Sequence, residues 1–206
     1  MLSPETIATF TIASVLLCLA PGPDNIFVLM QSAVHGRKAG LLVTIGLCTG
    51  LVGHTLAVAL GVAAVFQTSE VAFTILKLLG TAYLLYLAWK AFTASSQKLD
   101  KPVQLKPGEL YRRGVIMNIT NPKVSLFFLA FLPQFVSDEA GPVTIQIILL
   151  GLVFILCTAV VFGSVALLAG MLGEWLGRSP KAQFIMNKIA GVVFVALAIR
   201  IAMAVR

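Results

Sequence analysis

Hydrophobic residues occur in long uninterrupted runs that are separated by short polar connections. The runs, such as Val143 to Leu172, lack the strict alternation of inward and outward positions that marks a barrel strand. A helix needs about 20 apolar residues to cross the hydrocarbon core of a membrane. The pattern therefore predicts an all-α membrane protein with six transmembrane helices, at about Pro4 to Val34, Ala39 to Phe66, Val71 to Phe92, Gly114 to Val136, Pro142 to Leu172 and Phe184 to Val205.

The composition agrees with this pattern. Of 206 residues, 59% are hydrophobic and 11% are charged, whereas soluble domains contain about 45 to 50% and about 25%. Six crossings use up the chain, so no room is left for a soluble catalytic domain and we expect no enzyme. The net charge of +7 comes from basic residues in short connections without an interleaved aromatic patch. We therefore expect a lipid bilayer, and no nucleic acid, as the partner.

The basic residues also predict the orientation in the membrane. Lys and Arg gather in the connections between spans one and two, three and four, and five and six, whereas the other two connections contain none. Cytoplasmic loops carry the excess of Lys and Arg. Both termini are therefore predicted to lie outside the cytoplasm.

The two halves of the chain look related. The motif Lys77-x-x-Gly80-x-x-Tyr83 in span three recurs in span six as Lys188-x-x-Gly191-x-x-Phe194, and a proline break in span one recurs in span four. Because each half holds three spans, the halves would run in opposite directions, as in many secondary transporters. The sequence predicts one transmembrane domain over residues 1–206, with repeat one at 1–92, a cytoplasmic linker at 93–113 and repeat two at 114–206. Chance recurrence of the short motif is the alternative.

Span one is interrupted at Pro21, Gly22 and Pro23, because two prolines and a glycine disrupt helical geometry. Freed backbone groups cost several kcal/mol each in hydrocarbon, so the break belongs beside a cavity. Asp24 and Asn25 follow directly. A carboxylate at this depth must be paired, protonated or solvated by a polar pocket.

Span four carries the complementary break, at Asn118, Asn121, Pro122 and Lys123. These residues offer amide donors, amide acceptors and an ammonium, and the start of a half-helix favours an anion. If the breaks face each other, Asp24 and Lys123 approach near the midplane and a zwitterion fits between them. An ion pair that only fixes packing, and prolines that only kink the helices, are the alternatives.

These features define a candidate substrate site and no metal or cofactor site. The predicted substrate-binding residues are Pro21, Gly22, Pro23, Asp24, Asn25, Asn118, Asn121, Pro122 and Lys123, with Asp24 also as the proton-coupling residue. The three cysteines sit inside apolar runs, which indicates packing. Glycine-rich helix faces allow close helix packing, either between two copies of the chain in a homodimer or between helices of the same chain.

Several motifs together resemble the lysine-exporter and homoserine/threonine-efflux family of bacterial inner-membrane amino-acid exporters. They are Pro21-Gly22-Pro23-Asp24, the glycines from Gly36 to Gly50, Lys77-x-x-Gly80-x-x-Tyr83-Leu84, Gly114-x-x-x-Asn118-x-x-Asn121-Pro122-Lys123 and Phe131-Leu132-Pro133-Gln134-Phe135. The resemblance implies proton-coupled export of an amino acid or derivative from the cytoplasm. It also implies functional importance for Pro21, Pro23, Asp24, Asn118, Asn121, Pro122 and Lys123.

The leading hypothesis is a secondary exporter in which Asp24 meets the ammonium of a small zwitterion or carries the coupling proton. Lys123 and the asparagines would meet the carboxylate. The alternatives on the same scaffold are an ion or metal exporter, which would want clustered His, Cys or carboxylates, and a passive channel. A membrane enzyme with a dithiol at Cys18 would need a second cysteine in span four, which has none.

Overall fold

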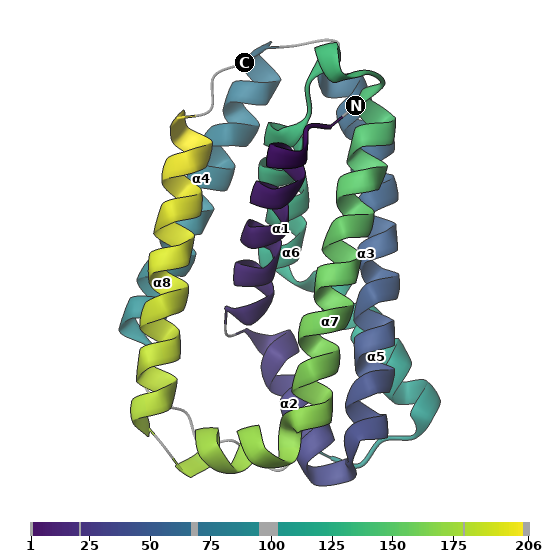
Figure 1. The fold of residues 1–206 in the computed structure, drawn as a ribbon, viewed down its shortest axis with the longest axis vertical. Coiled ribbons are helices and arrows are strands. Elements are labelled where there is room, and N and C mark those ends of the chain that lie inside the picture. Colours follow the sequence, from purple (N-terminus) through teal and green to yellow (C-terminus); the bar gives the residue numbers. More distant parts are fainter. Residues whose placement is uncertain (1, 21, 67–69, 95–102, 179, 204–206) are drawn as a thin grey trace.

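The computed structural model is helical throughout the part of the chain that it describes, which is all residues except 1, 21, 67–69, 95–102, 179 and 204–206 (Figure 1). Within that part the α-helices are α1 (Pro4–Leu19), α2 (Pro23–His35), α3 (Arg37–Phe66), α4 (Glu70–Thr93), α5 (Pro107–Thr120), α6 (Pro122–Leu126), α7 (Val143–Arg178) and α8 (Pro180–Met203). A π-helical turn η1 (Phe127–Phe131) and the 3-10 turns η2 (Leu132–Phe135) and η3 (Asp138–Ala140) follow α6.

The helices run along the long axis of a bundle, and α1 starts at the same end at which α8 finishes (Figure 1). Among the described residues, Arg37–Gly61 in α3 and Val143–Ala169 in α7 are long and apolar enough to cross a membrane. Two bent pairs pass the same test together: α1 with α2, bent by 61°, and α5 with the helical segment that ends at Phe135, bent by 49°. The described residues therefore supply two to four candidate spans, and the prediction of an all-helical membrane protein is confirmed at that level.

Both predicted breaks are present. Ala20 and Gly22 lie between α1 and α2 in extended conformations, and Asn121 lies extended between α5 and α6. Each of these residues precedes a proline, which disfavours the helical region for the residue before it. Ser3 caps the first helix, since its hydroxyl accepts a hydrogen bond from the Thr6 amide.

The helix that leads to the second break begins before the predicted span four. We expected it at Gly114, after a linker, but α5 begins at Pro107. Pro107 occupies the first helical position, and the Lys106 amide donates to the Glu109 carboxylate at 2.8 Å. These start signals act in a polar segment, where a search for apolar runs does not detect them.

Close glycine contacts hold the broken helix α5 against α3. A Cβ atom at Gly46 would collide with the Tyr111 carbonyl oxygen, and one at Gly114 would collide with the Val43 carbonyl oxygen. One turn along α3, a Cβ at Gly50 would lie 2.7 Å from the Asn118 side chain. Helices approach this closely only where side chains are absent, so these glycines fix the position of the second break.

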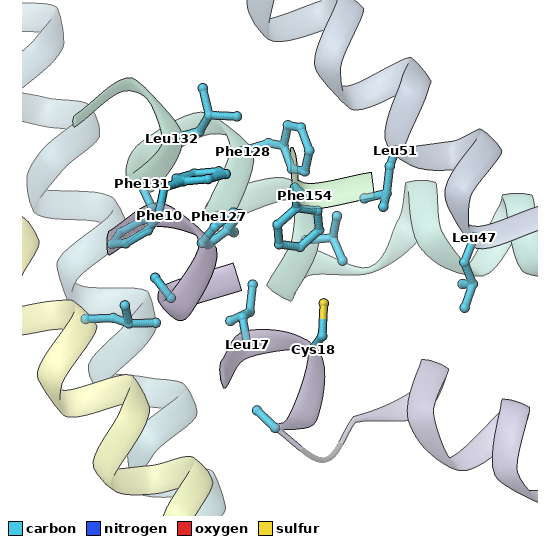
Figure 2. Close-up of a cluster of buried hydrophobic side chains, with 14 of the residues drawn as sticks. Phe10, Leu17, Cys18, Leu47, Leu51, Phe127, Phe128, Phe131, Leu132 and Phe154 are labelled. Atoms are coloured by element: carbon cyan, nitrogen blue, oxygen red, sulfur yellow. The ribbon is translucent and has the colours of Figure 1, made fainter. Parts of the chain in front are cut away.

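An aromatic cluster joins α1 to the segment after α6 (Figure 2). The Phe10 ring packs on Phe127, Phe131 and Phe135, with centroids 5.8, 6.5 and 5.2 Å away. Phe154 of α7 extends the cluster through Phe127, at 4.8 Å. The cluster lies on the N-terminal side of the first break, so it adjoins the candidate site.

Candidate functional site

The first break leaves the last carbonyl groups of α1 without helical partners, and side chains bind them. The Lys123 ammonium, which comes from the other break, donates to the Leu17 and Ala20 carbonyls at 3.3 and 3.1 Å. The Asn25 amide donates to the Cys18 carbonyl at 2.6 Å. A positive charge at the C-terminal end of a helix is favourable. Lys123 therefore closes the broken end of α1 across the interface between the two halves.

Gly22 makes room for that ammonium. A Cβ atom at this position would lie 3.2 Å from Lys123 Nζ. The backbone of Gly22, with φ −166° and ψ 174°, is extended and open to any residue. The position therefore requires glycine because glycine has no side chain, and not because of its backbone conformation.

Asn121 connects the second break to the first. Its Oδ1 accepts a hydrogen bond from the Lys123 amide at 3.0 Å, which caps α6, and its Nδ2 donates to Asp24 Oδ2 at 2.7 Å. This cap occupies the first free amide of the half-helix, which we had expected to be open to an anion. Asn121 therefore orients Asp24 and holds the two breaks together.

A small cavity lies between the breaks, lined by Asp24, Asn118, Lys123 and residues of α1, α3, α6 and α7. Its volume is about 20 Å³, and one water molecule needs roughly 10 to 15 Å³ of such space. In this conformation the cavity therefore has room for a water molecule and none for an amino acid.

Two buried oxygen atoms of residues that line this cavity have no hydrogen-bond partner. They are Asp24 Oδ1 and Asn118 Oδ1, on side chains that are 3% and 2% exposed. A buried acceptor without a donor costs about 1 to 3 kcal/mol, and more when it is charged.

The structure brings together five of the predicted site residues: Gly22, Asp24, Asn118, Asn121 and Lys123. Asp24 and Lys123 line the same cavity, as predicted, but no direct ion pair joins them, because Asp24 is bound by Asn121 and Lys123 by carbonyl groups. The packing-only ion pair is therefore not observed between these described residues. Their part in substrate binding stays a prediction.

The other predicted residues have different positions. Pro23 and Pro122 are exposed at the first positions of α2 and α6, where they form the breaks. Asn25 binds the Cys18 carbonyl and does not line the cavity. Pro21 lies outside the described residues.

Sequence reasoning missed the residues that α7 contributes to the lining of the cavity. Phe154, Thr158 and Phe162 line the cavity at successive turns of this helix, and Figure 2 shows the Cys18 thiol pointing toward the Phe154 ring. In the sequence these residues belong to one long apolar run, in which Thr158 is one of several polar residues.

Two polar side chains in apolar surroundings, His54 and Gln31, are hydrogen-bonded inside the bundle. His54 Nε2 lies 3.3 Å from the Asn118 carbonyl, and its ring packs on Phe128 with centroids 5.5 Å apart. The Gln31 amide donates to the Val103 carbonyl at 3.3 Å. His54 thereby binds the last turn of α5, next to the second break.

Comparisons with known proteins agree with this architecture. Residues 15–204 match the LysE type translocator family. The homoserine/homoserine lactone efflux protein of Salmonella typhimurium is 34% identical over 188 residues, which cover 90% of each chain. An uncharacterized membrane protein of Bacillus subtilis is 31% identical over 196 residues, covering 90% of this chain and 92% of the relative. No solved structure matches the chain. The protein belongs to the LysE type translocator family and is thus a membrane transporter rather than an enzyme.

Proposed function

We propose that the protein is a secondary transporter that exports a small zwitterionic amino acid, or a close derivative, from the cytoplasm. The observation that carries this proposal is that Asp24 and Asn118, each with an unpartnered buried oxygen, line one cavity together with Lys123. The similarity to a protein named for efflux of homoserine and homoserine lactone supports the substrate class.

The charges of the cavity match those of a zwitterion. The substrate ammonium donates to Asp24 Oδ1 and Asn118 Oδ1. The substrate carboxylate binds the ammonium of Lys123, which has three donors, two of which bind the end of α1. Opposite charges attract strongly in a site with little water, so the free energy of binding comes mainly from these charged contacts.

Substrate binding requires the breaks to separate, because the cavity has a volume of only about 20 Å³. A substrate carboxylate competes with the Leu17 and Ala20 carbonyls for Lys123. When the carboxylate displaces these carbonyl groups from Lys123, the end of α1 is released. The same helix carries Phe10 of the aromatic cluster. Substrate binding would thereby favour an open conformation, because a ligand that binds one conformation more tightly shifts the population toward that conformation.

We propose that the fold is an inverted repeat of two three-helix halves, which alternate access to the site from the two sides of the membrane. Support comes from the similar placement of the breaks: α1 supplies 16 residues before the first and α5 supplies 14 residues before the second. The basic connections favour a cytoplasmic membrane location with both termini outside.

Proton coupling is assigned to Asp24. Protonation from the outside would remove the negative charge that holds the substrate ammonium and would promote release. The neutral carboxyl group would then favour the return to the inward-facing conformation. The transport cycle would thereby exchange a proton from the outside for an amino acid from the cytoplasm.

Efflux of labelled homoserine from loaded proteoliposomes under an imposed pH gradient tests this proposal. We expect the wild-type protein to release homoserine, and to release it faster when the outside is acidic. When the pH gradient is reversed, we expect it to accumulate homoserine inside the proteoliposomes against the homoserine concentration gradient. We expect Asp24→Asn to abolish both the transport and its proton dependence. Unchanged transport with unchanged proton dependence in Asp24→Asn would contradict the role of Asp24, and transport without accumulation would indicate a passive channel.

A further inference from the structure

We infer that Thr158 of α7 selects the side chain of the transported molecule, and that it favours a short, uncharged side chain bearing an oxygen atom. The inference rests on the proposed export of an amino acid and adds the substrate class and a selecting residue. Thr158 lines the same cavity as Asp24, Asn118 and Lys123 and is 3% exposed.

The Thr158 hydroxyl behaves unlike the other buried hydroxyls in the described helices. Each of the others donates to the backbone carbonyl four residues earlier in its own helix, namely Ser14, Ser32, Thr44 and Thr55. Thr158 instead lies 3.4 Å from the Cys18 thiol. A hydroxyl in the interior of a helix usually bonds to its own backbone, so this side chain is turned toward the cavity.

The thiol leaves most of the hydrogen-bonding capacity of Thr158 unused. A hydroxyl has one donor and two acceptor sites, whereas a thiol is a weak donor and a weak acceptor. An oxygen atom of a ligand is a better partner than Cys18. The Thr158 hydroxyl therefore offers a polar group to a ligand in the cavity.

The other α7 residues in the cavity lining limit the size of the side chain. Phe154 and Phe162 lie one helical turn before and after Thr158 and line the same cavity. The Phe154 ring is held by Phe127 and Phe128, with centroids 4.8 and 5.3 Å away. Packed aromatic rings yield little, so a long side chain would not fit beside Thr158.

The charge balance of the cavity excludes a charged side chain. Among the described residues that line it, Asp24 is the one acid and Lys123 the one base. The ammonium and carboxylate that every amino acid carries use both. A third charge on the substrate would be buried without a partner, which is strongly unfavourable.

The test compares homoserine with norvaline, in which a methyl group replaces the hydroxyl, and with lysine. In proteoliposomes we expect the wild-type protein to prefer homoserine to norvaline and to exclude lysine. Thr158→Val keeps the shape but removes the hydroxyl. We expect it to lower the homoserine-to-norvaline ratio by about three- to tenfold, the effect of one hydrogen bond, while norvaline transport continues. Ser164→Ala, at an exposed position of α7 outside the cavity, should leave the ratio unchanged.

The outcomes separate the two proposals. If the wild-type protein transports none of the three amino acids, the proposed function fails. If it transports them but accepts lysine, or if the homoserine-to-norvaline ratio stays the same in Thr158→Val, the inference alone is overturned. Should Thr158→Val not fold, Thr158→Ala must lower the ratio and Thr158→Ser must preserve it, and equal ratios in these two variants would overturn the inference as well.

Discussion

Asn121 connects both helix breaks through the two ends of its side-chain amide. Its oxygen caps α6 and its nitrogen holds Asp24. The two tasks can be separated, because serine is an equally good N-cap but is too short to reach the Asp24 carboxylate.

We therefore predict that Asn121→Ser loses export while it keeps the cap, and that Asn121→Ala loses both. Thermal unfolding in detergent should show Asn121→Ala less stable than Asn121→Ser by about 1 kcal/mol, the usual value of an N-cap. Efflux from proteoliposomes should fall in both variants, because Asp24 Oδ2 loses its donor. Wild-type efflux in Asn121→Ser would show that the orientation of Asp24 by Asn121 is unimportant.

At the residue scale, the sequence singled out three polar residues that line the cavity, but it did not predict their hydrogen-bond partners. Asp24, Asn118 and Lys123 stood out because polar groups at these positions are costly in hydrocarbon. That Lys123 would bind the end of α1 depends on the distance between two halves of the chain, which no local pattern contains. Thr158 could not be identified, because a threonine in a membrane helix normally bonds to its own backbone.

At the element scale, the site depends on how closely α5 approaches α3. Gly46 and Gly114 meet with backbone against backbone, whereas Gly53 of α3 has no atom within 4 Å of where a Cβ would lie. A methyl group added at the contact must push the helices apart, and with them the Asn118 side chain beside Gly50. One added at Gly53 meets open space.

We predict that Gly46→Ala lowers the free energy of unfolding by about 1 to 3 kcal/mol, as for overpacking elsewhere, and reduces export. Gly53→Ala is the matched control on the same helix and should unfold at the wild-type temperature or slightly above it. Thermal unfolding of the three proteins in one detergent provides the comparison. Equal melting temperatures for Gly46→Ala and Gly53→Ala would contradict the described contact between α3 and α5.

The elements that the sequence predicted well are those with strong local signals. Both breaks follow from proline chemistry, and the long helices α3 and α7 follow from hydrophobic runs. The early start of α5 and the π-helical turn η1 were not predicted. The first lies in a polar segment, and the second depends on how Phe127 and Phe131 pack against Phe10, which is a tertiary contact.

At the scale of the whole molecule, the proposal requires the two ends of the bundle to face different compartments. Ser137, in the connection after η2, and Gly108, in the first turn of α5, are exposed and lie at the two ends of the candidate span formed by α5 and the segment that ends at Phe135. The basic connections indicate that Gly108 is cytoplasmic and Ser137 is outside.

We predict that a membrane-impermeant maleimide labels a cysteine at Ser137→Cys in intact cells, and that a cysteine at Gly108→Cys is labelled only after the membrane is permeabilised. The three native cysteines are first replaced by alanine in both proteins. Labelling of Gly108→Cys in intact cells, with protection of Ser137→Cys, would reverse the orientation and with it the proposed direction of transport.

The central claim is that the cavity between the two breaks binds a zwitterion through Asp24. Equilibrium binding of labelled homoserine to the purified protein tests it most directly, with Ser32→Ala as a control, since Ser32 is a buried hydroxyl on the same helix that bonds to the Val28 carbonyl. We predict that Asp24→Asn weakens binding by about ten- to a hundredfold, the effect of a charged hydrogen bond, and that Ser32→Ala binds as the wild type does. Wild-type affinity in Asp24→Asn would contradict the account.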